Sequence, residues 1–213
     1  MAKGKFKYYF LWLSLICIIV FILQLIIPGF TELFVLNLKA IYEKQYWRFL
    51  SAIFLHGSLT HLLFNLFALV IFGLILEKKI GSYRFLAVFF SSGIIANIVS
   101  VNFYDSSLGA SGAIMGIIGC LTILNPMMMV WAFGLLMPMF IAAILWVLGD
   151  ILGVFMPSGV GNIAHLSGVG VGLLIGLLLR FFGVKNIGNK NNTIRFNEDE
   201  VRNWENRYVK SER

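Results

Sequence analysis

Charged side chains are scarce in this sequence. Asp, Glu, Lys and Arg make up only 13% of its 213 residues, whereas 59% of the residues are hydrophobic. A soluble globular domain carries about 25% charged residues, so the composition excludes an ordinary soluble protein. It indicates one integral membrane domain.

Cysteine is also rare, with two residues in the chain. Cys17 and Cys120 both lie within apolar runs and show no motif spacing. We therefore interpret them as small hydrophobic residues and expect neither a disulfide framework nor a cysteine metal site. A cleavable signal peptide is not expected either, because the first apolar run is long and no small-residue cleavage site follows it.

Long apolar runs are what the sequence does contain. A bilayer core about 30 Å thick requires roughly 20 apolar residues per spanning helix. The fourth run is short, which predicts a helix buried inside the bundle. We predict an all-α membrane domain over residues 1–182, followed by a cytoplasmic polar tail over 183–213 that is partly helical. The six predicted spans are Tyr8–Ile27, Leu59–Leu76, Tyr83–Val101, Ser111–Leu124, Leu136–Phe155 and Ile163–Phe182.

The distribution of basic residues predicts the orientation. With the N-terminus in the cytoplasm, only Lys39, Lys44 and Arg48 of the 17 basic residues lie outside. The positive-inside rule favours this arrangement, with both termini cytoplasmic. The net charge of +7 is split between short loops and a mixed-charge tail, so we expect a lipid bilayer and no nucleic acid as partner.

Two connections between the predicted spans are unusual. Residues 28–58 are too apolar for a solvated loop and too broken for a span, so we expect them to lie in the membrane interface. Arg48 within them should bind backbone carbonyls or lipid phosphate and act as an anchor. Residues 127–134 are predicted to form an uncharged link on the cytoplasmic side, and Pro138 to start or kink the fifth span.

A lone serine interrupts the apolar sequence at the start of the fourth span, in Gly109-Ala110-Ser111-Gly112. Unpaired N–H groups and the positive end of the helix dipole lie beside Ser111 at that position. Such surroundings suit a nucleophile whose attack creates an oxyanion. The alternative is that the small residues only form a packing seam between helices.

Three further polar side chains enter apolar helices. His61 and Asn65 are spaced i, i+4 and share a helix face, and His165 lies near the start of the sixth span. Spans two, four and six run in the same direction, so these residues and Ser111 should lie at one depth on the external side. The spacing of His56 and His61 does not favour a metal site, and we expect no cofactor.

This convergence predicts a nucleophile and a general base, with Ser111 within hydrogen-bond reach of His165. His61, Asn65 and the Ser111 backbone N–H would then stabilise the oxyanion. A small-residue face that contains Gly112 should dock on a second face that contains Gly168. We predict a dyad, because no carboxylate takes a suitable place beside His165, and Asp150 is expected to cap, to pair or to face water.

The sequence resembles the rhomboid family of intramembrane serine proteases, from about Trp47 to Gly172. The resemblance rests on Trp47-Arg48, His56, His61 with Asn65, the turn at residues 77–81, Gly109-Ala110-Ser111-Gly112, and Ala164-His165 with Gly168. It implies a six-helix bundle around a water-filled cavity, cleavage of transmembrane protein substrates, Ser111 as nucleophile, His165 as base, and an oxyanion hole lined by His61 and Asn65. A prokaryotic cell membrane is the expected location.

One position departs from the pattern of some rhomboids. An aromatic residue that stacks on the catalytic histidine is replaced here by Met115, whose sulfur can still pack against an imidazole. Two rival interpretations remain open. One is an inactive rhomboid-like protein that binds or chaperones membrane segments, which should lack Ser111 or His165. The other is a transporter or channel, which should show paired charges and repeated halves.

Overall fold

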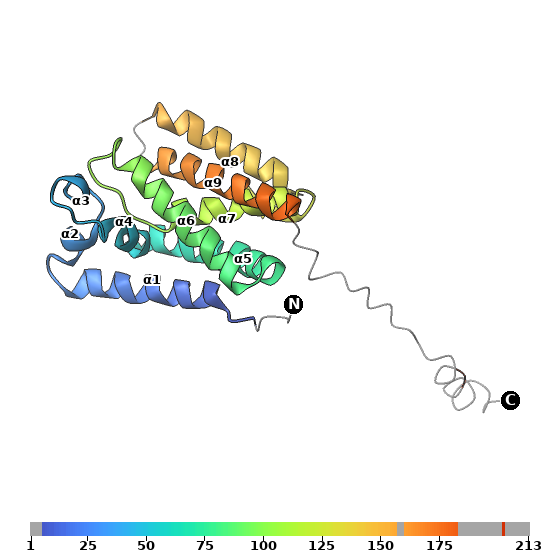
Figure 1. Cartoon of the computed structure of the whole chain (residues 1–213), viewed down its shortest axis with the longest axis horizontal. Helices are drawn as coiled ribbons and strands as arrows, with labels where there is room; N and C mark the ends of the chain where they lie inside the picture. The colour runs from blue at the N-terminus through green and yellow to red at the C-terminus, as the bar shows by residue number, and fades with distance from the viewer. Residues whose placement is uncertain (1–5, 157–159, 183–201, 203–213) are drawn as a thin grey trace.

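The structure is a computed structural model that describes residues 6–156, 160–182 and 202. Six long helices run side by side along the described chain (Figure 1). Each corresponds to one of the predicted spans, so the all-α membrane fold is confirmed. The six are α1 (Tyr9–Ile26), α5 (Leu59–Ile80), α6 (Ser82–Ser100), α7 (Ser111–Leu124), α8 (Met139–Val154) and α9 (Asn162–Phe181).

Helix α7 is the centre of the bundle. Every residue from Gly112 to Leu121 is buried, and α7 packs against α5, α6, α8 and α9. In Figure 1 it passes through the middle of the assembly, between α1 at one edge and α8 at the other. Its first residue, Ser111, is therefore held among several helices, as the short fourth span predicted.

The outer helices present apolar side chains away from this centre. Leu25 on α1 and Phe67 on α5 are 72% and 64% exposed. Four helices, α1, α5, α6 and α9, are long and apolar enough to cross a membrane, and α7 and α8 are shorter apolar helices. Exposed side chains of this kind are stable when they face hydrocarbon.

The connection between α1 and α5 is built from short helical pieces. They are α2 (Phe30–Phe34), α3 (Lys39–Tyr42), α4 (Arg48–Ser51) and the 3-10 helix η1 (Ala52–Phe54). None is long enough to span a bilayer, in agreement with the broken apolar pattern of the sequence. In Figure 1 these pieces gather beside one end of α1.

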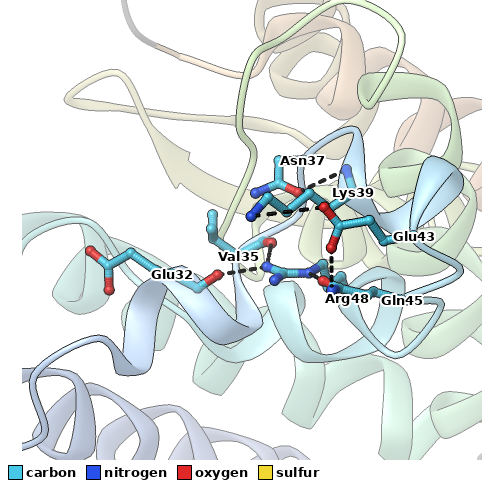
Figure 2. A network of polar contacts seen from close by, with 7 residues as sticks. All are labelled: Glu32, Val35, Asn37, Lys39, Glu43, Gln45 and Arg48. Atoms are coloured by element: carbon cyan, nitrogen blue, oxygen red, sulfur yellow. Dashed lines mark hydrogen bonds and ion pairs between the residues drawn. The ribbon is translucent and has the colours of Figure 1, made fainter.

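Arg48 holds this connection together. Its side chain is 3% exposed, and its Nη1 donates to the carbonyl oxygens of Glu32 and Val35 at 2.7 and 2.6 Å (Figure 2). Nε donates to Gln45. A buried guanidinium is stable when its donors are satisfied. Of the two partners predicted for Arg48, backbone carbonyls or lipid phosphate, the structure shows the carbonyls.

Glu77 has a similar structural role at the other end of the bundle. Its carboxylate is fully buried and accepts hydrogen bonds from the backbone N–H groups of Tyr9 and Phe10, at 3.1 and 3.0 Å, and from Ser82 Oγ at 2.6 Å. An acid from α5 thus caps the N-terminus of α1, where N–H groups lack helical partners.

The link between α7 and α8 differs from the prediction. Strands β1 (Met129–Ala132) and β2 (Leu135–Pro138) form an antiparallel hairpin, with Trp131 opposite Leu136. The fifth span therefore begins at Met139 and not at Leu136, with Pro138 as its N-cap. Gly134 takes a positive φ of 77° at the turn, which permits the tight reversal.

Several expectations concern residues outside the described ones. The N-terminal residues 1–5, which are expected in the cytoplasm, lie there, as do residues 183–201 and 203–213 of the polar tail with its expected helix.

Candidate active site

A cavity of about 1670 Å³ opens among the first turns of α5, α7 and α9 and the last turns of α8. The predicted convergence of polar side chains is found here. Ser111, His61, Asn65, His165, Met115, Gly109 and Gly112 all line this cavity, whereas Gly168 lies behind it in the contact between α7 and α9.

Ser111 is the first residue of α7. The preceding residue, Ala110, takes the N-cap position and supplies no side-chain cap. The first N–H groups of the helix therefore point, unopposed by a capping side chain, toward the cavity end of α7. Together with the positive end of the helix dipole they form an electrostatic environment that favours an anion beside Ser111.

Gly109 brings the loop before α7 against His61. Its φ of 122° is rarely adopted by residues with a side chain. A Cβ at this position would lie 2.9 Å from His61 Nε2 and 3.9 Å from Ser111 Oγ. Only glycine at residue 109 allows this loop to lie so close to the imidazole of His61.

His61 and Asn65 reach the cavity from the first two turns of α5. Ser58 Oγ caps this helix by accepting the His61 N–H at 3.1 Å. The amide of Asn65, which is 6% exposed, donates to the His61 carbonyl at 2.9 Å. An asparagine amide has two N–H groups, so this bond fixes the side chain and leaves a second donor.

His56 supports His61 from behind. Their rings meet edge-on with centroids 5.1 Å apart. His56 lies in the segment before α5, and burial, with a smaller contribution from His61, lowers the pKa of His56 to about 4. Its backbone pairs with the Gln24 side chain of α1, which accepts from the His56 N–H at 2.9 Å and donates to the His56 carbonyl at 3.2 Å. His56 is therefore held neutral and immobile.

The glycine seam between α7 and α9 lies below these groups. A Cβ on Gly168 would fall inside contact distance of the Gly112 carbonyl oxygen, and a Cβ on Gly172 would do the same at the Gly116 carbonyl. Two successive turns of α9 thus rest directly on the backbone of α7. This close approach places the start of α9, with His165, next to Ser111.

His165 has a partner that the sequence analysis did not predict. Its Nδ1 lies 2.9 Å from Oδ1 of Asp150, which is 8% exposed. The prediction that no carboxylate lies beside His165 is therefore wrong. Helix α8 runs antiparallel to α9 and ends where α9 begins, so a residue in the last turns of α8 meets one in the first turn of α9. A single acidic residue in an otherwise uncharged helix was the available signal.

The second imidazole nitrogen of His165 is the one available to Ser111. Both residues line the cavity, and the hydrogen bonds among the described residues include none between them. In ligand-free sites such bonds are often long and tighten only with substrate. The arrangement therefore places a serine hydroxyl and an imidazole, groups that can act as nucleophile and general base, in the lining of one cavity.

Met115 lies one turn after Ser111 on the same face of α7. It is 8% exposed and lines the cavity together with His165. Among the described residues, no group of three His, Cys, Asp or Glu side chains is placed to hold a metal ion. The side chains that converge on the start of α7 are a serine, histidines, an amide and the carboxylate of Asp150, in largely apolar surroundings.

Comparison with known proteins gives the family of the chain. The Rhomboid domain profile matches residues 43–181. RHOMBOID-like protein 5 of Arabidopsis thaliana is 31% identical over 159 residues, which cover 72% of this chain and 50% of that protein.

Two bacterial relatives, both from Bacillus subtilis (strain 168), are named as proteases. The putative rhomboid protease YdcA is 44% identical over 78 residues, which are 35% of this chain and 39% of that protein. Rhomboid protease GluP is 42% identical over 80 residues, or 37% of this chain and 16% of that protein. The chain thus spans half or less of the length of these relatives. The profile covers well over half of the chain, and this protein therefore belongs to the rhomboid family and is a multi-pass integral membrane protein.

Proposed function

We propose that the protein is an intramembrane serine endopeptidase that cleaves transmembrane segments of other membrane proteins. The convergence of Ser111, His165, His61 and Asn65 on one cavity carries this proposal. The names of the two bacterial relatives, both rhomboid proteases, support it.

The reaction follows from these positions. His165 Nε2 accepts the hydroxyl proton as Ser111 Oγ attacks the peptide carbonyl carbon. The resulting oxyanion takes hydrogen bonds from the Ser111 N–H, His61 and Asn65. Protonated His165 then gives its proton to the amine as the C–N bond breaks, leaving an acyl ester on Ser111. Water, deprotonated by His165, hydrolyses that ester and restores the serine.

The shape of the cavity supports a membrane-embedded substrate. From the polar end the cavity continues between α5 and α8, where Phe64, Ala68 and Phe72 face Leu145 and Trp146. Phe72 and Trp146 meet edge-to-face with centroids 5.9 Å apart. We infer that an apolar substrate segment enters between α5 and α8, and that its scissile bond lies at the polar end of the cavity, beside Ser111.

The bias of basic residues supports an orientation in which the cavity opens to the external side and both termini are cytoplasmic. We propose a prokaryotic cell membrane as the location.

The rival function is an inactive binder of membrane segments. Since both Ser111 and His165 are present in the cavity, the enzyme is the better supported of the two.

Covalent labelling tests the proposal directly. The purified protein in detergent should react with a fluorophosphonate at Ser111, and the parent in liposomes should cleave a model transmembrane substrate. Ser111→Ala should abolish both readouts, and His165→Ala should abolish cleavage with the fold retained. Because members of a catalytic unit are not additive, the double variant should be no worse. Cleavage by Ser111→Ala above a no-enzyme control would refute the mechanism.

A further inference from the structure

Asp150 is an acidic residue in an apolar helix of the membrane domain, where burial of a charged side chain costs free energy. It is the only charged residue of α8, whose sequence is otherwise apolar, and it is 8% exposed. An ionisable group in a spanning helix persists when it has a partner or a function. Lys39–Glu43 and His165–Asp150 are the two ion pairs formed within the described part of the chain. The partner of Asp150 is thus an imidazole and not a lysine or arginine.

We propose that Asp150 is a positioning residue for His165, so that the centre operates as a serine, histidine and aspartate unit. The inference rests on the proposed function. The Asp150 carboxylate accepts the Nδ1–H of His165 and so places the single proton of the neutral ring on Nδ1. Nε2 is then the unprotonated nitrogen, as a base facing Ser111 requires.

The carboxylate has a second effect during the reaction. When His165 takes the proton of Ser111, the ring becomes a cation 2.9 Å from Asp150 Oδ1. In a site with few polar neighbours this attraction is stronger than in water. The proton stays on His165 until it is delivered to the leaving amine. Asp150 itself exchanges no proton and forms no bond to substrate.

The positions of the helices make this contact part of the fold. His165 is in the first turn of α9 and is pressed onto α7 by the glycine seam. Asp150 is in the last two turns of α8, which packs against α9. The imidazole is therefore held from two sides, by α7 beneath it and by α8 at its Nδ1.

Asp150→Asn is the deciding substitution, because it keeps the shape and removes the charge. The amide can donate to Nδ1 and so favours the ring with its proton on Nε2, the wrong form for a base. We expect kcat for a transmembrane substrate in liposomes to fall by at least about 10², toward the roughly 10⁴ seen for this change in soluble triads. KM and the melting temperature should change little. Asp150→Glu should restore part of the rate.

Glu43→Gln is the matched control, since it removes the carboxylate of the other ion pair, Lys39–Glu43, and Glu43 is not among the residues that line the cavity. That variant should retain the parental rate. Nitrogen-15 NMR of labelled histidine adds a readout independent of turnover, and His165 should carry its proton on Nδ1 in the parent and on Nε2 in Asp150→Asn.

The outcomes separate this inference from the proposed function. A parent that neither cleaves substrate nor reacts with the fluorophosphonate at Ser111 would refute the proposed protease function. The NMR result alone would then decide whether Asp150 selects the His165 tautomer. In an active parent, three results would overturn the inference: an Asp150→Asn rate within threefold of the parent, an unchanged tautomer, or a loss of rate matched by an equal loss in Glu43→Gln.

Discussion

The contact between α7 and α9 yields the sharpest prediction about the fold. Gly168 lies three residues after His165, and its Cα rests against the Gly112 carbonyl. Gly168→Ala adds one methyl group at this point. Since real Cβ atoms do not approach other atoms within 3.0 Å, α9 has to retreat from α7 by about 1 Å.

That displacement acts on both stability and rate. Overpacking of a close helix contact costs about 1–3 kcal/mol, which should lower the melting temperature in detergent by roughly 5 °C. The same movement separates His165 from Ser111, and misplacement of a reacting group by about 1 Å costs roughly 10²-fold in rate. We therefore expect Gly168→Ala to melt earlier and to cleave a model substrate about a hundredfold more slowly.

Gly170 provides the matched control on the same helix. A Cβ there would meet no atom within 4 Å, so Gly170→Ala should fold and cleave like the parent. Its stability should rise slightly, because alanine has the higher helix propensity. Both variants are measured by thermal unfolding and by initial cleavage rates at equal folded fraction. If Gly168→Ala matched Gly170→Ala in both assays, α9 would not be held to α7 by this seam.

Three further predictions concern single side chains. Asn65→Ala should lower kcat by about 10² to 10³ while fluorophosphonate still labels Ser111, and full activity would remove Asn65 from the oxyanion hole. Met115→Ala should lower the cleavage rate at saturating substrate because the cavity floor beside His165 is lost, and Met115→Leu should not; equal rates for the two would contradict a supporting role. The folded pKa of His56, about 4 against an ordinary 6.5, means that between these pH values the unfolded chain binds a proton that the folded chain does not. Stability in detergent should thus fall by up to roughly 3 kcal/mol as the pH drops from 6.5 to 4, and His56→Gln should flatten this slope. Identical slopes of stability against pH in the parent and in His56→Gln would refute this role of His56.

The sequence predicted the long helices because a spanning helix has to be apolar along its whole length. The bounds of α5 and α7 begin at the predicted residues, Leu59 and Ser111. The seam was equally predictable, since glycines spaced four apart on α9 have few uses except close helix contact. Gly168 and Gly172 do rest on α7.

Two features escaped the sequence analysis for physical reasons. Residues 129–138 are apolar on both faces of the hairpin, so they lack the alternation that normally indicates strands. Of the three roles expected for Asp150, pairing with His165 was not singled out, because this partner lies 15 residues away, on the next helix. A contact between the end of one helix and the start of the next leaves no periodic pattern along the chain. Only the antiparallel packing of α8 on α9 reveals it.

The pairing of Gln24 with His56 connects the first helix to the proposed active site. Helix α1 precedes residues 43–181, the range shared with the family profile. Yet its Gln24 amide bonds both the N–H and the carbonyl of His56, as a neighbouring strand would. The ring of His56 in turn lies against His61. Exchanging α1 for an unrelated apolar helix would leave the N–H and the carbonyl of His56 without these partners, directly behind the proposed oxyanion site. If residues 43–181 were joined to another first helix, that helix would therefore need an amide side chain at the position of Gln24. Hydrophobicity alone would not be enough.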